Sequence, residues 1–379
     1  KIKMDSQNML MRDPVMYRIL FKDHHRTGSK WCIYPMYDWA HGESDYIEKI
    51  SHSLCTLEFK PHRDLYEWFL HQLPKENKIL PKQREFARLN MSYTIMSKRK
   101  LSYLIEKKIV SSWDDPRMPT ISGMIKRGYP PNALINFVKK AGIAKRENII
   151  DVSLMEFYVR EELNKTCARV MVVTDEIKLV IINYPEDKHE ILEATNNPED
   201  ESQGKRKMIF SKYLYIERED FRETANRKFF RLTTGKEVRL KNAYIIKAEN
   251  CIKNEKGEVI EVHCTYDPKS KSGSNSEESQ RKVKGTIHWV DINSSIDVNI
   301  NEYERLFFKE KPDENDDLIK GVNKNSKKLI VGKSEHFVSS LQIGQKVQFQ
   351  RKGYYIVDSN EGGVISFNKT VSLRDGWKK

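Results

Sequence analysis

The sequence predicts a multidomain protein in which an α/β part and a helical segment come first and all-β domains follow. Three observations support this prediction. Strand-like and helical runs alternate within residues 1–92, helical periodicity dominates residues 97–163, and short runs rich in Val, Ile and Tyr recur from residue 166 onward. With 379 residues, the chain is long enough for two or three domains, each with its own core.

The first 92 residues are predicted to form an α/β layer. A helix is expected over residues 63–73, where Asp64 places a negative charge at the positive end of the helix dipole. Within it, Leu65, Trp68, Phe69 and Gln72 recur at helical spacing. The strand-like runs that precede it are residues 16–21, 31–34 and 53–59. Strands and a helix that alternate at this spacing favour an α/β arrangement.

Helices are predicted for the middle of the chain. One begins at residues 130–132, which include two prolines, and ends near Gly142; another begins after Asp151. The apolar faces are Leu134, Phe137, Val138 and Ala141 in the first helix, and Leu154, Phe157, Tyr158 and Leu163 in the second. Residues 113–117 read as a loop that enters a further helix near Thr120.

The last part of the chain is predicted to be all-β. Its short strand-like runs are residues 168–173, 178–182, 212–216, 243–248, 259–266, 285–290, 346–349 and 354–357. Because turn residues separate them regularly, they favour β-barrels or sandwiches. Two polar stretches interrupt the pattern: we expect residues 186–207 to be a weakly structured insertion and residues 268–284 to be a mobile loop.

Charge narrows the class of partner. The chain has 67 Lys and Arg against 54 Asp and Glu, a net charge of +13. Basic residues cluster at 82–108 and 227–241, which suits a polyphosphate or nucleic acid, although a solvated basic surface stays an alternative. The five Cys and ten His have no metal-ligand spacing, so we expect no disulfide framework and no structural metal. No apolar run reaches membrane-spanning length and no signal peptide is apparent. Because the Cys are scattered and odd in number, a reducing, cytoplasmic location is expected.

One short motif suggests chemistry. Met96-Ser97-Lys98-Arg99 follows an apolar run and precedes a helix expected to begin near Leu101. Mobile cations at a strand-to-helix joint are well placed to bind phosphates. Taken alone, this motif is weak and favours a solvated basic loop.

Stretches along the whole chain resemble the glutaminyl-tRNA synthetase family, which belongs to the class I aminoacyl-tRNA synthetases. They are residues 31–38 (Trp-Cys-Ile-Tyr-Pro-Met-Tyr-Asp), 52–59 (His-Ser-Leu-Cys-Thr-Leu-Glu-Phe), 88–90, 96–100, 113–123, 128–129, 238–244, 367–371 and 373–375. The stretches occur in the family's order. The resemblance therefore covers the chain from one end to the other.

The resemblance implies a fold: a partial Rossmann-type catalytic domain, a helical connecting subdomain and two anticodon-binding β-barrels. Residues 1–92 would hold the end of the acceptor-binding insertion and the second half of the Rossmann domain, and residues 93–166 the Met-Ser-Lys-Arg loop and the helical subdomain. Residues 167–181 with 289–379 would form the proximal barrel, and residues 182–288 the distal barrel. The family's His-Ile-Gly-His motif and an initial Met are absent. We therefore expect a C-terminal fragment that is inactive alone.

The resemblance also implies ligands. Family members activate L-glutamine with ATP and Mg²⁺ and transfer it to tRNA(Gln). Met96, Ser97 and Lys98 would act on ATP, with Lys98 stabilising the triphosphate in the transition state, and Arg88 and Leu89 would contact ATP. The glutamine pocket would include Tyr37, His41, Cys55 and Gln83. The anticodon contacts would be Arg169, Arg231, Arg239, Lys241, Gln348, Arg351, Lys369 and Arg374, with Lys241 and Lys369 standing where better-studied members carry Arg.

Two alternatives stay open. One is a glutamyl-tRNA synthetase of the archaeal or eukaryotic type, against which the run at residues 53–59 favours glutamine. The other is a non-catalytic tRNA-binding module, for which the Lys98 loop and the Tyr37 pocket would have no purpose. A monomer is expected in each case.

Overall fold

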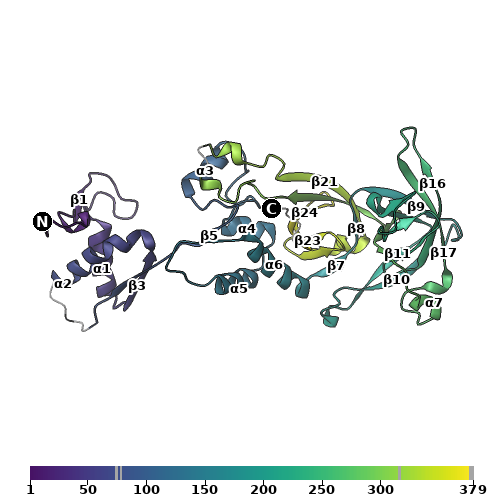
Figure 1. Cartoon of the computed structure of the whole chain (residues 1–379), viewed down its shortest axis with the longest axis horizontal. Coiled ribbons are helices and arrows are strands. Elements are labelled where there is room, and N and C mark those ends of the chain that lie inside the picture. Colours follow the sequence, from purple (N-terminus) through teal and green to yellow (C-terminus); the bar gives the residue numbers. More distant parts are fainter. Residues whose placement is uncertain (73–75, 77–78, 315–316, 375–379) are drawn as a thin grey trace. The chain divides into compact units, whose positions relative to one another are not determined.

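The computed structural model describes residues 1–72, 76, 79–314 and 317–374. The chain forms two compact units (Figure 1). The first comprises Lys1–Asn90 and Ala141–Ile150, and the second comprises Met91–Lys140 and Asp151–Lys379. The return of Ala141–Ile150 to the first unit was not expected from the sequence. It is fixed in part by the backbone N–H of Ala87, which donates to the carbonyl of Ala144 at 2.7 Å.

The first unit is built around a β-α-β arrangement. Its elements are β1 (Tyr17–Ile19), β2 (Ile33–Pro35), α1 (Tyr37–Ile47), β3 (His52–Thr56), α2 (Arg63–Gln72) and β4 (Lys82–Phe86). Strands β3 and β4 pair in parallel, and α2 connects them in sequence. The α/β prediction is confirmed, and the predicted end of the helix at residue 73 lies outside the described residues. Helix α1 packs on α2, where the Trp39 ring meets the Phe69 ring edge-on, with 5.0 Å between centroids.

The second unit begins with helices whose ends match the sequence signals. They are α3 (Lys98–Glu106), α4 (Ile121–Arg127), α5 (Pro131–Ala141) and α6 (Val152–Thr166), with the two-residue strands β5 (Asn90–Met91) and β6 (Ile149–Ile150) nearby in sequence. The side chains of Thr120 and Asp151 cap α4 and α6 by accepting backbone N–H groups. Helix α3 begins three residues before the predicted Leu101, because Ser97 adopts the extended conformation of an N-cap residue.

A seven-stranded barrel-like sheet forms the C-terminal part of the second unit, and we call it the C-terminal sheet. Its order is β7 (Ala168–Val170), β22 (Lys346–Phe349), β23 (Gly353–Glu361), β24 (Val364–Ser372), β20 (Ile296–Tyr303), β21 (Lys327–Ser334) and β8 (Val172–Val173). The two edge strands, β7 and β8, are separated in sequence only by Met171. One short segment therefore supplies both edges, which brings the sheet close to a closed barrel.

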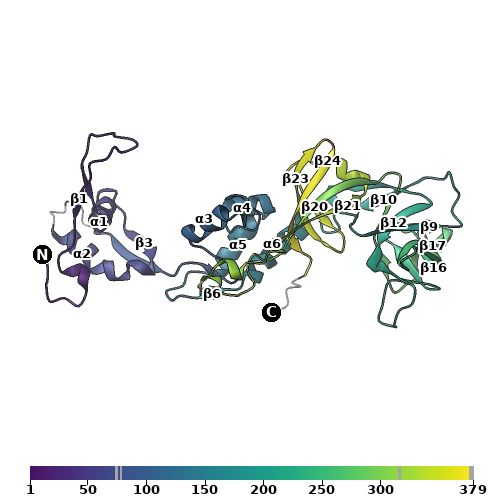
Figure 2. The same cartoon turned by 90° about the horizontal axis from the view of Figure 1, so that it is seen from above.

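A second barrel-like sheet is inserted between β8 and β20, and we call it the inserted sheet. Its order is β18 (Thr286–Ile287), β15 (Glu237–Leu240), β16 (Ile245–Lys253), β17 (Val259–Tyr266), β9 (Glu176–Ile181), β12 (Tyr213–Glu217) and β19 (Trp289–Asp291). Its two edge strands are again consecutive, separated only by His288. The fully buried Trp289 lies in its core. Figure 2 shows the C-terminal sheet between helices α3–α6 and the inserted sheet.

Strand pairing differs from the predicted domain limits at two places. Strands β9 and β19 fall within the residues assigned to the proximal barrel, yet both pair in the inserted sheet. The reason is geometric: β12 needs a partner on each side, and β9 and β19 provide them by antiparallel pairing.

The two stretches expected to lack structure are ordered into elements. Residues 186–207 contain β10 (Glu190–Thr195), which pairs with β11 (Lys205–Phe210) in an antiparallel hairpin. The prediction was wrong because only alternate residues of these strands, among them Leu192 and Met208, are buried, so the exposed faces make the stretch read as polar. Residues 268–284 include α7 (Glu277–Gln280) and lie against Arg239, which donates hydrogen bonds to the carbonyls of Ser270 and Ser279. Between β12 and β15 in the sequence lie the two-residue strands β13 (Phe221–Arg222) and β14 (Leu232–Thr233).

Candidate functional site

A groove of about 920 Å³ lies where the C-terminal and inserted sheets meet, and we call it the inter-sheet groove. Four of the residues predicted from the sequence line it: Arg169, Lys241, Gln348 and Arg351. The other lining residues are Thr195, Pro198, Glu201, Gly204, Lys205, Asn242, Thr286, Ile287, His288 and Gln350. Pairing of β7 with β22 brings Arg169 and Gln348 side by side in register. The fold thus gathers residues that are up to 182 positions apart in the sequence.

Arg169 forms a buried cationic corner of the groove, with 7% of its surface exposed. Its guanidinium donates to the carbonyl of Cys167 at 2.7 Å and to the side-chain oxygens of Asn197 at 2.5 Å and Asn164 at 2.9 Å. All three acceptors are neutral, so these contacts orient the guanidinium without cancelling its charge. An anion or an electron-rich base edge in the groove would meet that charge.

Two further groups offer hydrogen bonds at the same groove. Gln348 donates through its Nε2 to the hydroxyl of Tyr354 at 2.8 Å, and this hydroxyl donates to Asn164 at 3.3 Å. The bonds link the Gln348 amide to the residues that orient Arg169. Lys241 lies on the inserted sheet's side, next to Asn242, whose φ of 58° places it in the left-handed region that Asn tolerates. That turn holds Lys241 at the groove.

Arg351 is tied across the two sheets by a buried acid. It follows β22, has a φ of 68°, and donates its Nη2 to Oδ1 of Asp220 at 2.6 Å and its Nη1 to the other carboxylate oxygen. Asp220 is fully buried, and Arg231 lies 3.2 Å from its Oδ1. Two predicted anticodon residues therefore share one carboxylate. Arg351 thereby joins the two sheets, whereas Arg231 comes from the same stretch of chain as Asp220.

A second buried acid lies beside this cluster. Glu217 accepts the backbone N–H of Thr174 at 2.7 Å and lies 2.9 Å from the Lys352 ammonium. Burial by itself would raise the pKa of Glu217, but neighbouring His288 and Lys352 lower it to about 2. His288 is 2% exposed, and its Nε2 lies 3.5 Å from Glu217, an ion-pair distance rather than a hydrogen bond. The seam between the sheets is thus a network of buried charges.

The remaining predicted anticodon residues lie elsewhere. Arg239 is committed to the carbonyls of residues 268–281, and burial lowers its pKa. Lys369 pairs with Glu302 at 2.6 Å. Arg374 is exposed, and with Lys369 it lines a different cavity, next to helices α4 and α6. The structure does not bring these three side chains to the inter-sheet groove.

In the first unit, Tyr37 and His41 lie one turn apart on α1. Their ring centroids are 5.0 Å apart, and the His41 Nε2 lies 2.6 Å from the hydroxyl of Ser53 and 3.2 Å from Asp45. Asp45 also accepts a hydrogen bond from the hydroxyl of Tyr66 at 2.9 Å. Tyr37 is 53% exposed. Partial burial and nearby negative groups raise the pKa of Tyr37, so its hydroxyl is protonated and able to donate at neutral pH. A fixed imidazole beside an accessible phenol suits recognition of a polar side chain.

Cys55 and Gln83 differ from each other in accessibility. Cys55 is half-buried near Tyr37, and burial raises the pKa of its thiol. Gln83 is only 1% exposed, and its amide donates to the carbonyl of Phe59 and to Glu85, both at 2.9 Å. The predicted pocket therefore has three members that lie together, while both donor bonds of Gln83 are made inside the unit.

The predicted ATP residues belong to different units. Arg88 is exposed in the first unit and donates its Nε to the side chain of Asn90 at 3.0 Å, and Leu89 is half-buried beside it in sequence. Met96, Ser97 and Lys98 belong to the second unit, where Ser97 is the N-cap of α3 and Lys98 is exposed. Buried Ile95 and Leu101 anchor this loop in the core. The first turn of α3 carries basic residues and no acid, which favours an anion at this helix end.

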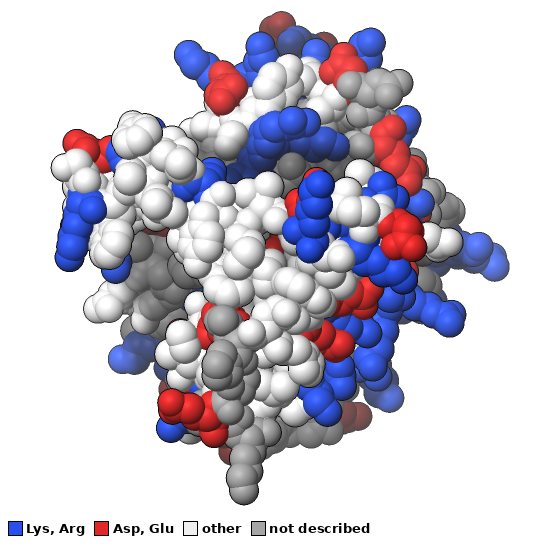
Figure 3. Space-filling model, turned by 90° about the vertical axis from the view of Figure 1, so that its left-hand side faces the viewer, with Lys and Arg blue, Asp and Glu red and all other residues white. Residues whose placement is uncertain are grey.

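Charge is unevenly spread over the surface. On the face seen in Figure 3, uncharged residues form a broad central area and Lys and Arg gather mainly toward the right-hand edge. Among the described residues, no group of three or more His, Cys, Asp or Glu is placed to hold a metal ion. None of the helices in the described part of the chain has the length and hydropathy of a membrane span.

Sequence reasoning missed several groove residues, chiefly Asn242, His288 and Gln350. Asn242 lay inside a stretch used for the resemblance, and its position directly before the predicted strand at residues 243–248 was a usable turn signal. His288 gave no signal, because a single His within an apolar run reads as a core residue.

Comparison with known proteins identifies the relatives of this chain. Residues 1–165 match the catalytic domain of the tRNA synthetases class I (E and Q), and residues 167–267 and 286–358 match two anticodon-binding domains of the same class. The chain is 51% identical over its whole length to a glutamine–tRNA ligase of Rhodopirellula baltica, of which it covers 63%. It is 49% identical to glutamine–tRNA ligases of Clostridium perfringens and Psychromonas ingrahamii, and it covers 68% of each. The chain thus spans about two thirds of the length of these relatives.

Proposed function

Because the chain belongs to the class I tRNA synthetases (E and Q), we propose that the whole protein is a cytoplasmic glutamine–tRNA ligase. It would activate L-glutamine with ATP and Mg²⁺ and transfer the aminoacyl group to tRNA(Gln). Within this chain, the C-terminal and inserted sheets would read the anticodon. The sequence similarity to glutamine–tRNA ligases supports glutamine over glutamate.

The inter-sheet groove is the observation that supports anticodon binding most directly. Its volume of about 920 Å³ leaves room for unstacked bases, and Arg169, Lys241 and Gln348 supply a forked donor, a point charge and an amide. Splayed single-stranded bases are recognised by such groups on their hydrogen-bonding edges. The neutral partners of Arg169 leave its charge for a base or a phosphate.

The remaining roles follow the same proposal. Tyr37, His41 and Cys55 would contact the side chain of glutamine, and Lys98 with Ser97 and Met96 would hold the phosphates of ATP. Arg88 and Leu89 would contact ATP from their own unit. Mg²⁺ would reach the site with ATP, since a Mg²⁺ ion in such enzymes is bound largely through substrate phosphates and water. The chain by itself would be inactive, and monomeric.

Two assays test the proposal. The chain should bind tRNA(Gln) transcript with an affinity that falls steeply as salt rises, and Arg169→Gln should weaken that binding about tenfold. Binding whose affinity changes neither with salt nor with Arg169→Gln would rule out the groove as the tRNA-binding site. ATP–pyrophosphate exchange by the chain should not exceed that of Lys98→Ala; exchange above that control would refute the prediction that the chain is inactive alone.

The alternatives have their own discriminators. Charging of full-length protein with glutamate instead of glutamine would indicate a glutamyl-tRNA synthetase. A native mass near 45 kDa would favour a non-catalytic tRNA-binding module.

A further inference from the structure

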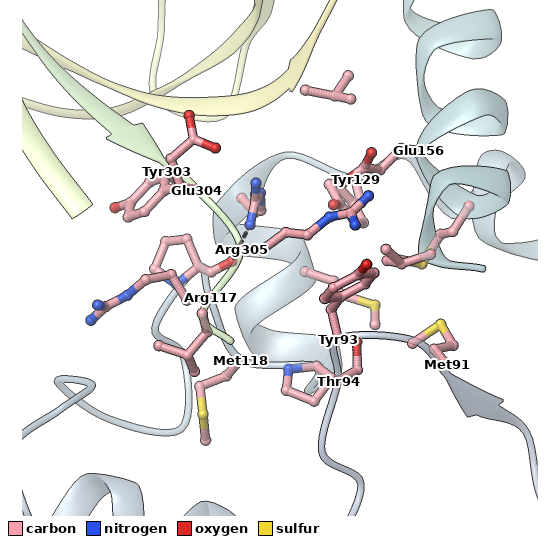
Figure 4. A pocket seen from close by; sticks show the side chains of 18 of the residues that line it. Met91, Tyr93, Thr94, Arg117, Met118, Tyr129, Glu156, Tyr303, Glu304 and Arg305 are labelled. Carbon is pink, nitrogen blue, oxygen red and sulfur yellow. Dashed lines mark hydrogen bonds between the residues drawn. The ribbon is translucent and has the colours of Figure 1, made fainter. Parts of the chain in front are cut away.

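A second cavity, of about 260 Å³, lies within the second unit, and we call it the Arg127 cavity. Its walls come from the segment before Met96, from α4 and α6, and from the ends of β20 and β24 (Figure 4). It shares no lining residue with the inter-sheet groove. Two predicted anticodon residues, Lys369 and Arg374, belong to its lining, but neither they nor the proposed catalytic loop account for the methionine and tyrosine side chains that line the rest.

The walls of the Arg127 cavity are mainly apolar and aromatic. Four methionines line it, Met91, Met118, Met124 and Met155, together with three tyrosines, Tyr93, Tyr129 and Tyr303. Met118, Met155, Tyr129 and Tyr303 are each less than 8% exposed. Flexible thioethers next to aromatic rings form surfaces that adapt to a flat apolar ligand. Figure 4 shows Tyr93, Tyr129 and Arg305 directed toward the same space.

Arg127 adds a positive charge without a matching acid. Its Nε donates to the carbonyl of Thr370 at 3.2 Å and its Nη1 to the carbonyl of Pro116 at 3.3 Å. Its guanidinium carbon lies 5.8 Å from the ring centre of Tyr129 and 5.7 Å from that of Tyr303. Within the described part of the chain, no carboxylate lies within ion-pair distance of it. Partly buried charge of this kind is stabilised by a bound anion.

Neighbouring cations differ in this respect. Arg117 is paired with Asp115 at 2.8 Å, and Lys369 is paired with Glu302 at 2.6 Å. Arg160 lies 4.0 Å from Glu156. Arg127 thus differs from these three cations of the cavity wall, which also includes Arg305 and Arg374.

The lining of the cavity carries charges of both signs. Two acids, Glu156 and Glu304, stand among six cations, Arg117, Arg127, Arg160, Arg305, Lys369 and Arg374, so the charged groups together favour an anion. The methionine and tyrosine side chains between them favour an anion that carries an apolar body. The volume fits such a molecule, since a cavity of about 150 Å³ already holds benzene.

We propose that the Arg127 cavity binds a small aromatic carboxylate, with its acid group on Arg127 and its ring between the methionine and tyrosine side chains. This site shares no lining residue with the inter-sheet groove, and of the predicted anticodon residues it includes Lys369 and Arg374. Ile95 and Leu101, which flank the Met96–Lys98 segment, are both part of the wall. An occupant would therefore touch the residues that anchor both ends of that segment.

Binding can be measured directly on the chain. Indole-3-acetate and benzoate serve as probes, and their neutral amides, indole-3-acetamide and benzamide, serve as size-matched controls. Titration followed by NMR should give saturable binding of the acids and at least about tenfold weaker binding of the amides, which lack the charge-assisted contact. Equal affinity of acid and amide, or no saturation by either acid, would overturn the proposal.

Methyl-labelled methionine locates the site without any substitution. The chain has 12 Met, of which four line the cavity, while Met171 and Met208 lie in the core of the inserted sheet. Indole-3-acetate should shift the signals of the four lining residues and leave those of Met171 and Met208 in place. Shifts absent from the four, or spread equally over all the Met signals, would refute the assignment.

A pair of variants tests the anchor. Arg127→Gln should weaken indole-3-acetate binding about tenfold while leaving indole-3-acetamide unchanged. Arg222→Gln is the matched control, because it removes a guanidinium that lies 4.7 Å from the ring centre of Phe229, far in sequence and outside the cavity lining. Loss of acid binding in both variants, or in neither, would contradict the role of Arg127. If Arg127→Gln fails to fold, the methionine shifts in the unsubstituted chain still decide the matter.

Discussion

Replacing Asp220 with Asn removes the negative charge on which the seam between the two sheets depends. Asp220 is fully buried, its Oδ1 accepts a hydrogen bond from Arg351 at 2.6 Å, and Arg231 lies 3.2 Å from the same oxygen. Arg351 lies after β22 of the C-terminal sheet, whereas Asp220 follows β12 of the inserted sheet. The substitution keeps the size of the side chain and leaves a guanidinium without its counter-ion.

The expected cost follows from the full burial of Asp220, whose partner Arg351 has a side chain that is 29% exposed. Removing one partner of a buried, hydrogen-bonded ion pair destabilises a protein by about 3–5 kcal/mol, because the other charge stays buried and uncompensated. Asn still offers one carbonyl oxygen, so we expect a cost near the lower end, about 3 kcal/mol. The matched control is Asp175→Asn. Its partner Arg218 lies 3.0 Å away, but both side chains are more than 40% exposed, and the expected cost is below about 1 kcal/mol.

Urea unfolding followed by tryptophan fluorescence measures the difference, because the fully buried Trp289 reports on the core of the inserted sheet. A double-mutant cycle with Arg351→Gln isolates the pair. The double variant should be less costly than the sum of the single variants by about 2 kcal/mol or more, since it removes both charges together. Additive costs, or a cost for Asp220→Asn no larger than that for Asp175→Asn, would refute this account of the seam.

Three further outcomes are expected. Charged neighbours lower the pKa of Glu217 in the folded protein to about 2, so the ionised carboxylate stabilises the fold by about 3 kcal/mol at pH values above its unfolded pKa. This stabilisation is lost as the pH falls from about 5 to 2. In Glu217→Gln, the free energy of unfolding should therefore depend less on pH over that range. Gly128→Ala should lower the free energy of unfolding by well over 2 kcal/mol in the same urea assay, because the φ of Gly128 is 91° and a Cβ there would lie 2.7 Å from the hydroxyl of Thr370. Gly142 has a φ of 71° but open space around it, so Gly142→Ala should cost only about 1 kcal/mol. Arg169→Lys should restore less than half of the tRNA-binding free energy lost in Arg169→Gln, because an ammonium cannot reproduce the three directed hydrogen bonds to Cys167, Asn164 and Asn197. Filter binding at a fixed salt concentration compares the affinities of the two variants.

Helix α6 illustrates how far periodicity reaches. The sequence predicted both the helix and its start after Asp151, which caps it. The expected apolar face was Leu154, Phe157, Tyr158 and Leu163. Leu163 is buried as expected, but Phe157 is 51% exposed, and the other buried residues are Val152, Met155 and Val159. A shift of one position turns the helix by about 100°, and with apolar residues on both faces only the neighbouring sheet decides which face is covered.

The groove illustrates a different limit. Arg169, Lys241, Gln348 and Arg351 were found through resemblance, and the fold brings them together. Arg239 was selected in the same way, yet its guanidinium is bound to the carbonyls of the segment after β17. The identity of a cation does not indicate which acceptors its fold will supply. The Asp220 network was missed for the same reason, since its members come from both sheets and have no local spacing in common.

The pairing of β7 with β22 has a consequence for synthesis of the chain. Val170 leaves the ribosome about 180 residues before its partner Phe349, because the entire inserted sheet is made in between. At about 5–20 residues per second, this interval is roughly 10–35 s. During that time the inserted sheet can complete its own pairing, while β7 and β8 stay as unpaired strand edges that are open to association with other chains. Translational pausing between residues 300 and 345 should therefore lower the yield of folded protein more than an equal pause before residue 165.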